Sequence, residues 1–499
     1  MKLEKFLQDN YNYNPEVKDN IKTYIEQWKS WYAGNVKSFH NYFIYNGQRK
    51  VNKKRFTLNM AKEISEDWAD ILWSEKCEIS LKDTSSQEQF DELIDNLDIY
   101  TTITQAIEKS GALGTEVAVV SAYDIIKNED GMTLDVSNAK TRVNLVDVDW
   151  VFPLSWDNTG ITECAFGSVK YIDGQKYVVL SVHKINENTG NYVIYNHLFS
   201  ETNGNLTEVL GQEGTENEFD TKSNVKWFAP FKPLLTNNLF SDSPFGIPHY
   251  ANAIDVMKTV DIDFDAFKNE VKDGRRRTFA RAEMFNYDNG EQKLTFDPND
   301  TDIYMLPKGA NKDDLIQQDH DNLRVNEQIE ALNTSLNILG NKVGFGENHY
   351  HFDGTNLSTA TAVISSNSKM ARRMKKLQIG YESAIYDLVK AICYVSSTFG
   401  VYNLNTDDMV IQFDDSIIED VESESVRALR EYNAGLISAV EYRMRIFGES
   451  KEIAEKAIEE IRLDNPSVED IINDNELNEE ERKNNNDRIV ETALKKMGL

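Results

Sequence analysis

The spacing of apolar residues changes along the chain, and each change predicts a different kind of element. Residues 58–74 carry apolar side chains every three or four positions, Met60 and Trp68 among them, which predicts an amphipathic helix. From residue 116 to residue 210 apolar and polar residues alternate instead, as in EVAVVSAYD and KYVVLSVHKI. Polar turns separate these runs, so the region predicts a meandering antiparallel sheet.

A long amphipathic helix is predicted from Pro248 to Gly274, because proline suits the first turn of a helix and glycine its C-terminal cap. Such a helix spans roughly 40 Å at about 1.5 Å per residue. Its neighbouring face is predicted to be a mixed-charge edge, made of Lys258, Asp261, Asp265, Lys268 and Lys272. The apolar stripe of this helix consists of Tyr250, Ile254, Met257, Val260, Phe264, Phe267 and Val271.

After this helix the pattern predicts short strands over residues 278–314 and a second helix over residues 322–343. One helix therefore leads out, a small β-rich unit intervenes, and another helix returns. This order predicts a helical hairpin that ends in a compact knob.

Residues 344–357, GFGENHYHFDGTNL, are rich in glycine and asparagine and predict a flexible loop that the helix cannot enter. Ser358 or Thr359 can cap the next helix, which is predicted to run to about Phe399. A strand, MVIQFDD, follows. Beyond Ile417 the chain reads as helical and strongly acidic.

The chain has 499 residues, with 83 acidic and 54 basic side chains and a formal net charge of -29. This length favours about three or four domains. The acidic balance argues against ordinary nucleic-acid binding, which depends on neutralising phosphates, but it is compatible with a conduit along which DNA slides. No signal peptide or membrane span is expected, and the three widely separated cysteines predict small buried residues of a reducing cytoplasm.

Motifs that would carry catalysis are missing from the sequence. There is no Walker phosphate loop, no HExxH, no GxSxG and no calcium-loop pattern. Asp147 and Asp149 could be imagined as metal ligands, but their alternate spacing more simply predicts one solvent-facing side of a strand. His349 and His351 lie in the glycine-rich loop without a nearby cysteine, so no metal or other cofactor is predicted.

Two basic groups stand out in this acidic chain. The first lies between Gly354 and Tyr381, a stretch without acidic residues, and could be a solvated face, a partner of an acidic neighbouring subunit, or a contact for DNA phosphates. It consists of Lys369, Arg372, Arg373, Lys375 and Lys376. The second could bind DNA, pair within an assembly or dock a partner. It consists of Arg275, Arg276, Arg277 and Arg281.

Four blocks of the sequence, in order, resemble the portal proteins of tailed bacteriophages, of the siphophage type found in phages of Gram-positive hosts. They are LNMAKEISEDWADILWSEKCEIS, VNLVDVDWVFPLSWDNTGITECAFGS with the strands after it, NNLFSDSPFGIPHYANAIDVMKTVDIDFDAFKNEV with the basic run after it, and FDGTNLSTATAVISSNSKMARRMKKL. Together they cover most of residues 55–400. The match rests on their ordered combination, because no single block is a chemical fingerprint.

The resemblance implies an α+β portal fold in which helices and an antiparallel sheet form a wing, two helices form a stem, and a small β-rich unit forms a clip. A long tunnel-side helix and a helical C-terminal crown complete it. The implied parts are the wing over residues 1–245 and 358–415, the stem over 246–274 and 320–343, the clip over 275–319, the tunnel loop over 344–357 and the crown over 416–499. Within the loop, the residues expected to face DNA are Asn348, His349, Tyr350 and His351.

The resemblance also implies a non-enzymatic function. Such proteins form a ring of about twelve subunits at one capsid vertex, through which double-stranded DNA enters and leaves the virion. The expected partners are the terminase large subunit, the major capsid and scaffolding proteins and a head-tail connector protein, with no membrane. Assembly is expected in the bacterial host cytoplasm.

Two other classes of function stay open from the residues alone. A metal-dependent nuclease or phosphotransferase would use Asp147 and Asp149 and would lose turnover on Asp149→Ala. A monomeric adaptor of the head-tail junction would form no closed ring, and it explains the long helical hairpin poorly.

Overall fold

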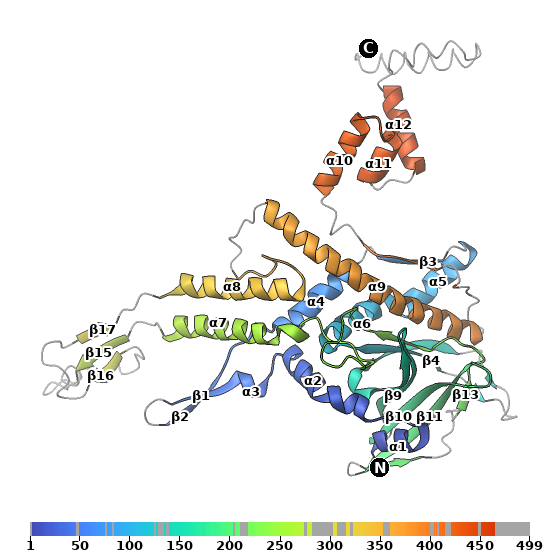
Figure 1. The fold of residues 1–499 in the computed structure, drawn as a ribbon, viewed down its shortest axis with the longest axis horizontal. Helices are drawn as coiled ribbons and strands as arrows, with labels where there is room; N and C mark the ends of the chain where they lie inside the picture. Colours follow the sequence, from blue (N-terminus) through green and yellow to red (C-terminus); the bar gives the residue numbers. More distant parts are fainter. Residues whose placement is uncertain are drawn as a thin grey trace, which may run out of the picture. The chain divides into compact units, whose positions relative to one another are not determined.

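The computed structural model describes most of the chain in two compact units, residues 1–414 and 415–499 (Figure 1). The described residues are 2–45, 49–74, 77–81, 84–123, 126–127, 134–135, 139–172, 174–202, 205–209, 218–273, 277–281, 303–306, 316–319, 323–352, 360–399, 404, 406, 409–414, 421–447 and 451–464. Helices and antiparallel strands share the first unit, so the fold is α+β as predicted.

The N-terminal third is mostly helical. Its elements are α1 (Leu3–Tyr11), α2 (Glu16–Tyr32), α3 (Lys37–His40), β1 (Asn41–Tyr45), β2 (Lys50–Lys54), α4 (Met60–Leu72), β3 (Glu78–Leu81), α5 (Thr84–Asn96) and α6 (Ile99–Leu113). Helix α4 confirms the amphipathic pattern of residues 58–74, because Ile64 and Trp68 on its apolar side are fully buried.

The β-rich region is divided between two larger sheets and the short β5–β6 pair, so the prediction of a single meandering sheet was wrong. The larger sheet has the order β12-β11-β10-β9-β8, with β13 also pairing with β11, whereas β4 pairs with β7 and with β14 in a separate sheet. The strands are β4 (Glu116–Tyr123), β5 (Ile126–Lys127), β6 (Leu134–Asp135), β7 (Lys140–Asp147), β8 (Val151–Asp157), β9 (Gly160–Ile172), β10 (Gln175–Ile185), β11 (Tyr192–Thr202), β12 (Asn205–Glu208), β13 (Glu218–Asp220) and β14 (Phe228–Phe231).

The switch between the sheets occurs at a short 3-10 helix, η1 (Val148–Trp150), which separates β7 from β8. Trp150 lies flat against Gly167 of β9, where a Cβ atom would come within 2.4 Å of the indole ring. Helix α1 then covers the larger sheet: Phe6 packs edge-on against Phe199, with ring centroids 5.0 Å apart. Alternation identifies strands but not their partners, since pairing depends on residues far along the chain.

The predicted helical hairpin is present as η2 (Ala251–Ala253), α7 (Ile254–Asp273) and α8 (Val325–Val343), and α7 and α8 lie side by side (Figure 1). Between them in the chain come β15 (Arg277–Arg281), β16 (Ile303–Leu306) and β17 (Ile316–Asp319), with β15 parallel to β16 and antiparallel to β17. The α-helix begins later than Pro248 because Tyr250 is fixed in the body: its hydroxyl donates to the carbonyl oxygens of Trp28 and Ala112.

Helix α9 (Ala360–Thr398) packs on β4, β7 and β14, and β18 (Met409–Gln412) pairs with β3. The second unit consists of α10 (Val421–Asn433), α11 (Ala439–Phe447) and α12 (Lys451–Asp464) in its described part, in line with the helical pattern beyond Ile417. Cys77, Cys164 and Cys393 are buried free thiols, as predicted. None of the described helices has the length and apolar character needed to cross a membrane.

Candidate functional site: the helical hairpin and the loop at its base

The two helices of the hairpin meet along an apolar seam. Met257 and Val260 of α7 and Leu332, Leu336 and Leu339 of α8 are at most 3% exposed. Two polar contacts flank this seam. Ser335 Oγ donates to Asp263 Oδ2 over 2.6 Å, and Arg324 Nη2 pairs with Glu270 Oε2 at 2.9 Å. The seam therefore joins α7 to α8 along most of their length.

The opposite flank of α7 is held by buried carboxylates, which are two members of the predicted mixed-charge edge. Asp261 is 2% and Asp265 is 7% exposed. Asp261 Oδ1 accepts from the Leu58 amide at 3.0 Å, and Asp265 Oδ1 accepts from the Phe56 amide at 3.2 Å. The i, i+4 spacing of two aspartates beside an apolar stripe was the available signal, but the sequence did not indicate what would cover them.

His40 also contacts Asp261 on this flank. The hydrogen bonds of its two ring nitrogens identify its tautomer. Its Nδ1 atom accepts from the Val36 amide at 3.0 Å, so the ring proton of the neutral form lies on Nε2. That proton is directed at Asp261 Oδ2, 3.2 Å away. Burial raises the pKa of Asp261, although the hydrogen bonds from Leu58 and His40 oppose the shift.

The described part of the predicted loop, residues 344–352, is an ordered segment rather than a flexible one. Gly344 has a φ of +105°, which ends α8, and the amides of Gly344, Phe345 and Gly346 all donate to the Gly340 carbonyl oxygen. Asn337 of α8 also accepts from the Asn348 amide at 2.8 Å. The loop therefore folds back on the helix that it leaves.

Aromatic stacking fixes the same segment to α4. Phe345 lies between two rings, with its centroid 4.5 Å from that of Trp68 and 4.2 Å from that of His349. The Tyr350 hydroxyl donates to Asp67 Oδ2 at 2.7 Å, and the side chain is 8% exposed. Tyr350 is thus buried inside the subunit, which corrects its expected exposure, and no comparable burial affects Asn348 or His349. Residues 353–357 lie outside the described part.

The five basic residues of α9 differ in their burial and in their contacts. Lys369 Nζ donates to the Asn341 carbonyl oxygen at 2.7 Å, whereas Arg372, Lys375 and Lys376 are exposed and form no ion pair within the described residues. Arg373 is partly buried beside Gly344, and burial lowers its pKa. The group is therefore not a uniform solvated face.

The second basic group lies partly outside the described structure. Arg275 and Arg276 fall in that part, while Arg277 and Arg281 are the first and last residues of β15. The described backbone thus places two of the four arginines on one short strand.

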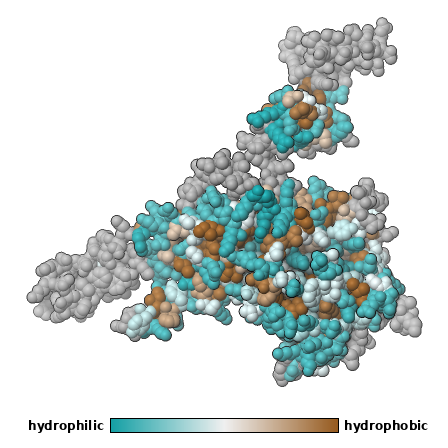
Figure 2. Space-filling view, in the orientation of Figure 1, coloured by the Kyte–Doolittle hydropathy of each residue, from teal (hydrophilic) through white to brown (hydrophobic). Residues whose placement is uncertain are grey.

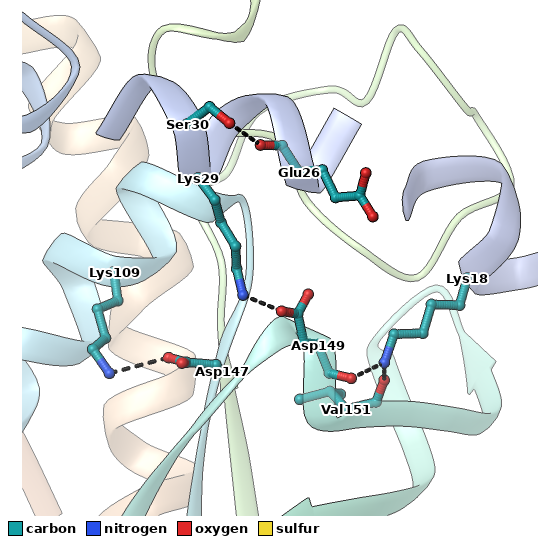
Figure 3. Close-up of polar contacts among 8 residues, drawn as sticks. All are labelled: Lys18, Glu26, Lys29, Ser30, Lys109, Asp147, Asp149 and Val151. Atoms are coloured by element: carbon teal, nitrogen blue, oxygen red, sulfur yellow. Dashed lines mark hydrogen bonds and ion pairs between the residues drawn. The ribbon is translucent and has the colours of Figure 1, made fainter. Parts of the chain in front are cut away.

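Asp147 and Asp149 do not form the imagined metal site (Figure 3). Asp147 ends β7 and Asp149 lies in η1, so they do not share one side of a strand. Asp147 Oδ1 pairs with Lys109 Nζ at 3.2 Å, and Asp149 pairs with Lys29. Across the described residues, no three side chains of metal-binding type come together. Each of the two carboxylates is therefore paired with a lysine of a neighbouring helix.

Glu116 is a third carboxylate beside Lys109, at 3.4 Å, and is fully buried. Burial raises its pKa to about 7, while the attraction of Lys109 lowers it and Asp147 raises it further. The opposing directions show that one shared lysine does not offset the cost of burying this carboxylate.

The described residues thus form a protein of the α+β class in which α7 and α8 pack side by side along an apolar seam. The family model for the phage portal protein, SPP1 Gp6-like, matches residues 13–467. The chain therefore belongs to this family of phage portal proteins. A search of curated proteins gave no match. As a portal protein it is a structural component of the capsid vertex, where an oligomeric ring provides the channel for DNA packaging.

Proposed function

We propose that about twelve copies of this chain close into a ring whose stem is made of α7 and α8. In this arrangement residues 275–319 form the clip, residues 1–245 and 358–415 the wing, and residues 416–499 the crown. The observation that carries the proposal is the α7–α8 hairpin, with an apolar seam and a three-stranded sheet between its helices in the chain. The family membership of residues 13–467 supports it.

The mechanism that we propose is mechanical. The ring offers a channel and docking surfaces, and a separate terminase hydrolyses ATP. The clip, with Arg275, Arg276, Arg277 and Arg281, binds the terminase large subunit during packaging and a head-tail connector protein afterwards. The wing contacts major capsid and scaffolding proteins during assembly in the host cytoplasm, and DNA leaves through the same channel at ejection.

The loop at the base of the hairpin is the proposed DNA-facing element. Its described half supplies a rigid support, because Phe345 and Tyr350 fix it to α4. Asn348, His349 and His351 are then the side chains proposed to meet the duplex. Arg372, Lys375 and Lys376 of α9 are exposed cations that contact passing phosphates or an acidic neighbouring subunit.

The first test is electron microscopy of the purified protein together with mass measurement. Closed rings with a central hole wide enough for a duplex are expected. A protein that stays monomeric at all concentrations, and that cleaves DNA in a metal-dependent manner, would contradict the proposal in favour of a nuclease.

The loop is tested separately. Replacing Asn348 with Gly and His349 and His351 with Ser removes the side chains proposed to meet the duplex. It keeps the stack of Phe345 on Trp68 and the Tyr350 bond to Asp67, so rings should still form. DNA filling or retention in assembled heads should fall. As a control, a Tyr350→Phe variant removes only the hydroxyl bond to Asp67 and should retain filling. Normal filling by the replaced loop would refute its role.

A further inference from the structure

Most of the described side chains of the β1–β2 hairpin are exposed. Its five residue pairs run from Asn41 opposite Lys54 to Tyr45 opposite Lys50. A two-stranded hairpin is marginally stable in water by itself. Its base is fixed to α7, since the Tyr42 hydroxyl donates to Asp265 Oδ2 at 3.1 Å. A hairpin of this kind is stabilised further when another surface covers it.

One face of this hairpin combines aromatic and basic side chains. Phe43 and Tyr45 are 57% and 64% exposed, and they share this face with the exposed Lys50 and Lys54 because strand residues two apart project together. Lys50 Nζ lies 4.5 Å from the centroid of the Phe43 ring. Figure 2 shows apolar surface, in brown, on the projecting hairpin. The sequence from residue 37 to residue 62 contains no acidic residue, in a chain of net charge -29.

A complementary stripe runs along the exposed side of α8. Glu327 and Glu330 lie at one end and Ile338, which is 53% exposed, at the other, with Ala331 and Thr334 between them. From Glu327 to Ile338 the helix rises roughly 16 Å, and the five-residue strand β1 spans roughly 13 Å. The two surfaces therefore match in length, in charge and in apolar content.

These two surfaces lie on opposite flanks of α7 within one subunit. Successive helical residues turn by about 100°, so Asp261 and Asp263 project about 200° apart. Asp261 bonds to the segment that carries the hairpin, whereas Asp263 bonds to Ser335 of α8. Figure 1 likewise draws β1–β2 and α8 on either side of α7. One subunit consequently cannot join its own hairpin to its own α8 stripe.

We propose that the aromatic and basic face of β1–β2 docks on the α8 stripe of a second copy of this chain. Phe43 and Tyr45 then pack on Ile338 and Ala331, and Lys50 and Lys54 pair with Glu327 and Glu330. A contact between different patches on opposite flanks is heterologous, which closes into a ring when repeated. This inference rests on the proposed ring and names the surfaces that join its subunits.

A charge-exchange experiment on the full chain tests the contact. The variant K50E/K54E should lower the fraction of protein in rings at least about tenfold, because two ion pairs become repulsive at every interface. The variant E327K/E330K should do the same. The two sets combined in one chain should restore rings, a result that simple misfolding does not give. Mass photometry gives the ring fraction, and circular dichroism checks the fold.

The hairpin of β9 and β10 supplies a matched control. Tyr171 is 70% exposed there, and Lys170 precedes it. The variant K170E/Y171S should leave the ring fraction unchanged. If the wild type forms rings and K50E/K54E forms them equally well, the inference is overturned while the portal function stands. Normal rings with impaired binding of a DNA duplex would assign the hairpin to DNA instead.

Disulfide capture gives a second readout that does not depend on ring closure. Asn52→Cys lies on the same hairpin face, and Thr334→Cys lies in the α8 stripe. The native thiols are buried, so background crosslinking is low. Mixing the two single-cysteine variants should give crosslinked dimers, and the double variant a ladder of multimers. Without crosslinks in either case, the proposed contact is wrong even if the protein forms rings by other surfaces.

Discussion

The two flanks of α7 are stabilised by different chemistry. Towards α8 the contact is apolar, and Val260, Leu336 and Leu339 are at most 3% exposed. Towards residues 40–58 the contact is polar, with Asp261 and Asp265 accepting from backbone amides. Both flanks exclude water, but buried carboxylates lie only on the flank that faces residues 40–58.

The apolar flank therefore mainly stabilises the packing of α7, whereas the polar flank mainly specifies which residues lie against it. Apolar burial is roughly proportional to area and has little directionality, so it provides most of the free energy of the α7–α8 contact. A buried carboxylate must find its donors, so Asp261 and Asp265 specify which amides lie against α7. Because β1 and β2 belong to that N-terminal segment, the polar flank also sets where the hairpin begins.

The largest expected effect comes from breaking the apolar flank. Leu336→Ala should lower the free energy of unfolding by about 3 kcal/mol, because it leaves a cavity between α7 and α8. Chemical denaturation of the purified chain measures this loss. Ile262→Ala, on α7 but 46% exposed, should change it by less than about 0.5 kcal/mol. Equal effects at the two positions would mean that the seam is not where the structure has it.

Breaking the polar flank should cost less in stability. Asp261→Ala leaves the Leu58 amide and His40 Nε2 without their acceptor, and a loss of about 2 kcal/mol is expected. Asp261→Asn retains one acceptor oxygen and should cost less than Ala. Hydrogen exchange should localise the change: the Leu58 amide loses protection, while amides within α8 keep theirs. Loss of protection in α8 as well would mean that the two flanks are not separable.

Asp261 and Asp265 are buried with hydrogen-bond donors, whereas one carboxylate oxygen of the buried Glu116 has none among the described residues. The dependence of stability on pH should reveal this difference. Glu116 Oε2 has no hydrogen-bond partner among the described residues, and burial raises its pKa to about 7. The folded protein then holds a proton that the unfolded chain releases at lower pH, so the free energy of unfolding falls as pH rises from about 4.5 to about 7. Glu116→Gln should remove this slope.

The expected gain from Glu116→Gln is roughly 2 kcal/mol at about pH 8 and close to zero at about pH 4.5. Denaturation at a series of pH values measures it. Asp147→Asn removes a nearby carboxylate that raises the pKa of Glu116, so it should reduce the slope without abolishing it. A variant Glu116→Gln that is equally stabilised at both pH values would exclude titration of this group as the cause.

The smallest expected effect concerns the ion pair at the end of the seam. Arg324 is 68% exposed where it pairs with Glu270, so solvent screens the attraction. Arg324→Ala should leave thermal unfolding close to that of the wild type in high salt. A large loss in high salt would show that the pair contributes more than its exposure allows.

Much of the fold could be predicted from periodicity because the pattern of burial is local. The seven-residue stripe from Tyr250 to Val271 predicted α7, and the stripe from Val325 to Leu339 predicted α8. Alternation predicted β8 to β11 for the same reason. The failures all concern packing partners. The mixed-charge edge gave no sign that Asp261 would be buried, and the strands after residue 116 were expected in a single sheet, whereas β4 belongs to a separate one. The loop was expected to be flexible, because nothing in GFGENHYHF indicates that Trp68 will stack on Phe345.

The sequence by itself determined the class of elements, their order and the ordered blocks that mark a phage portal protein, since each depends on residues close together in the chain. Only the tertiary structure decided which polar groups are buried and what they bind. Asp261 meets Leu58 and His40, and Tyr350 meets Asp67, across separations of more than 200 residues. Contacts between residues so far apart in the chain depend on how whole helices and sheets pack. A local pattern of hydrophobic and polar residues therefore cannot predict them.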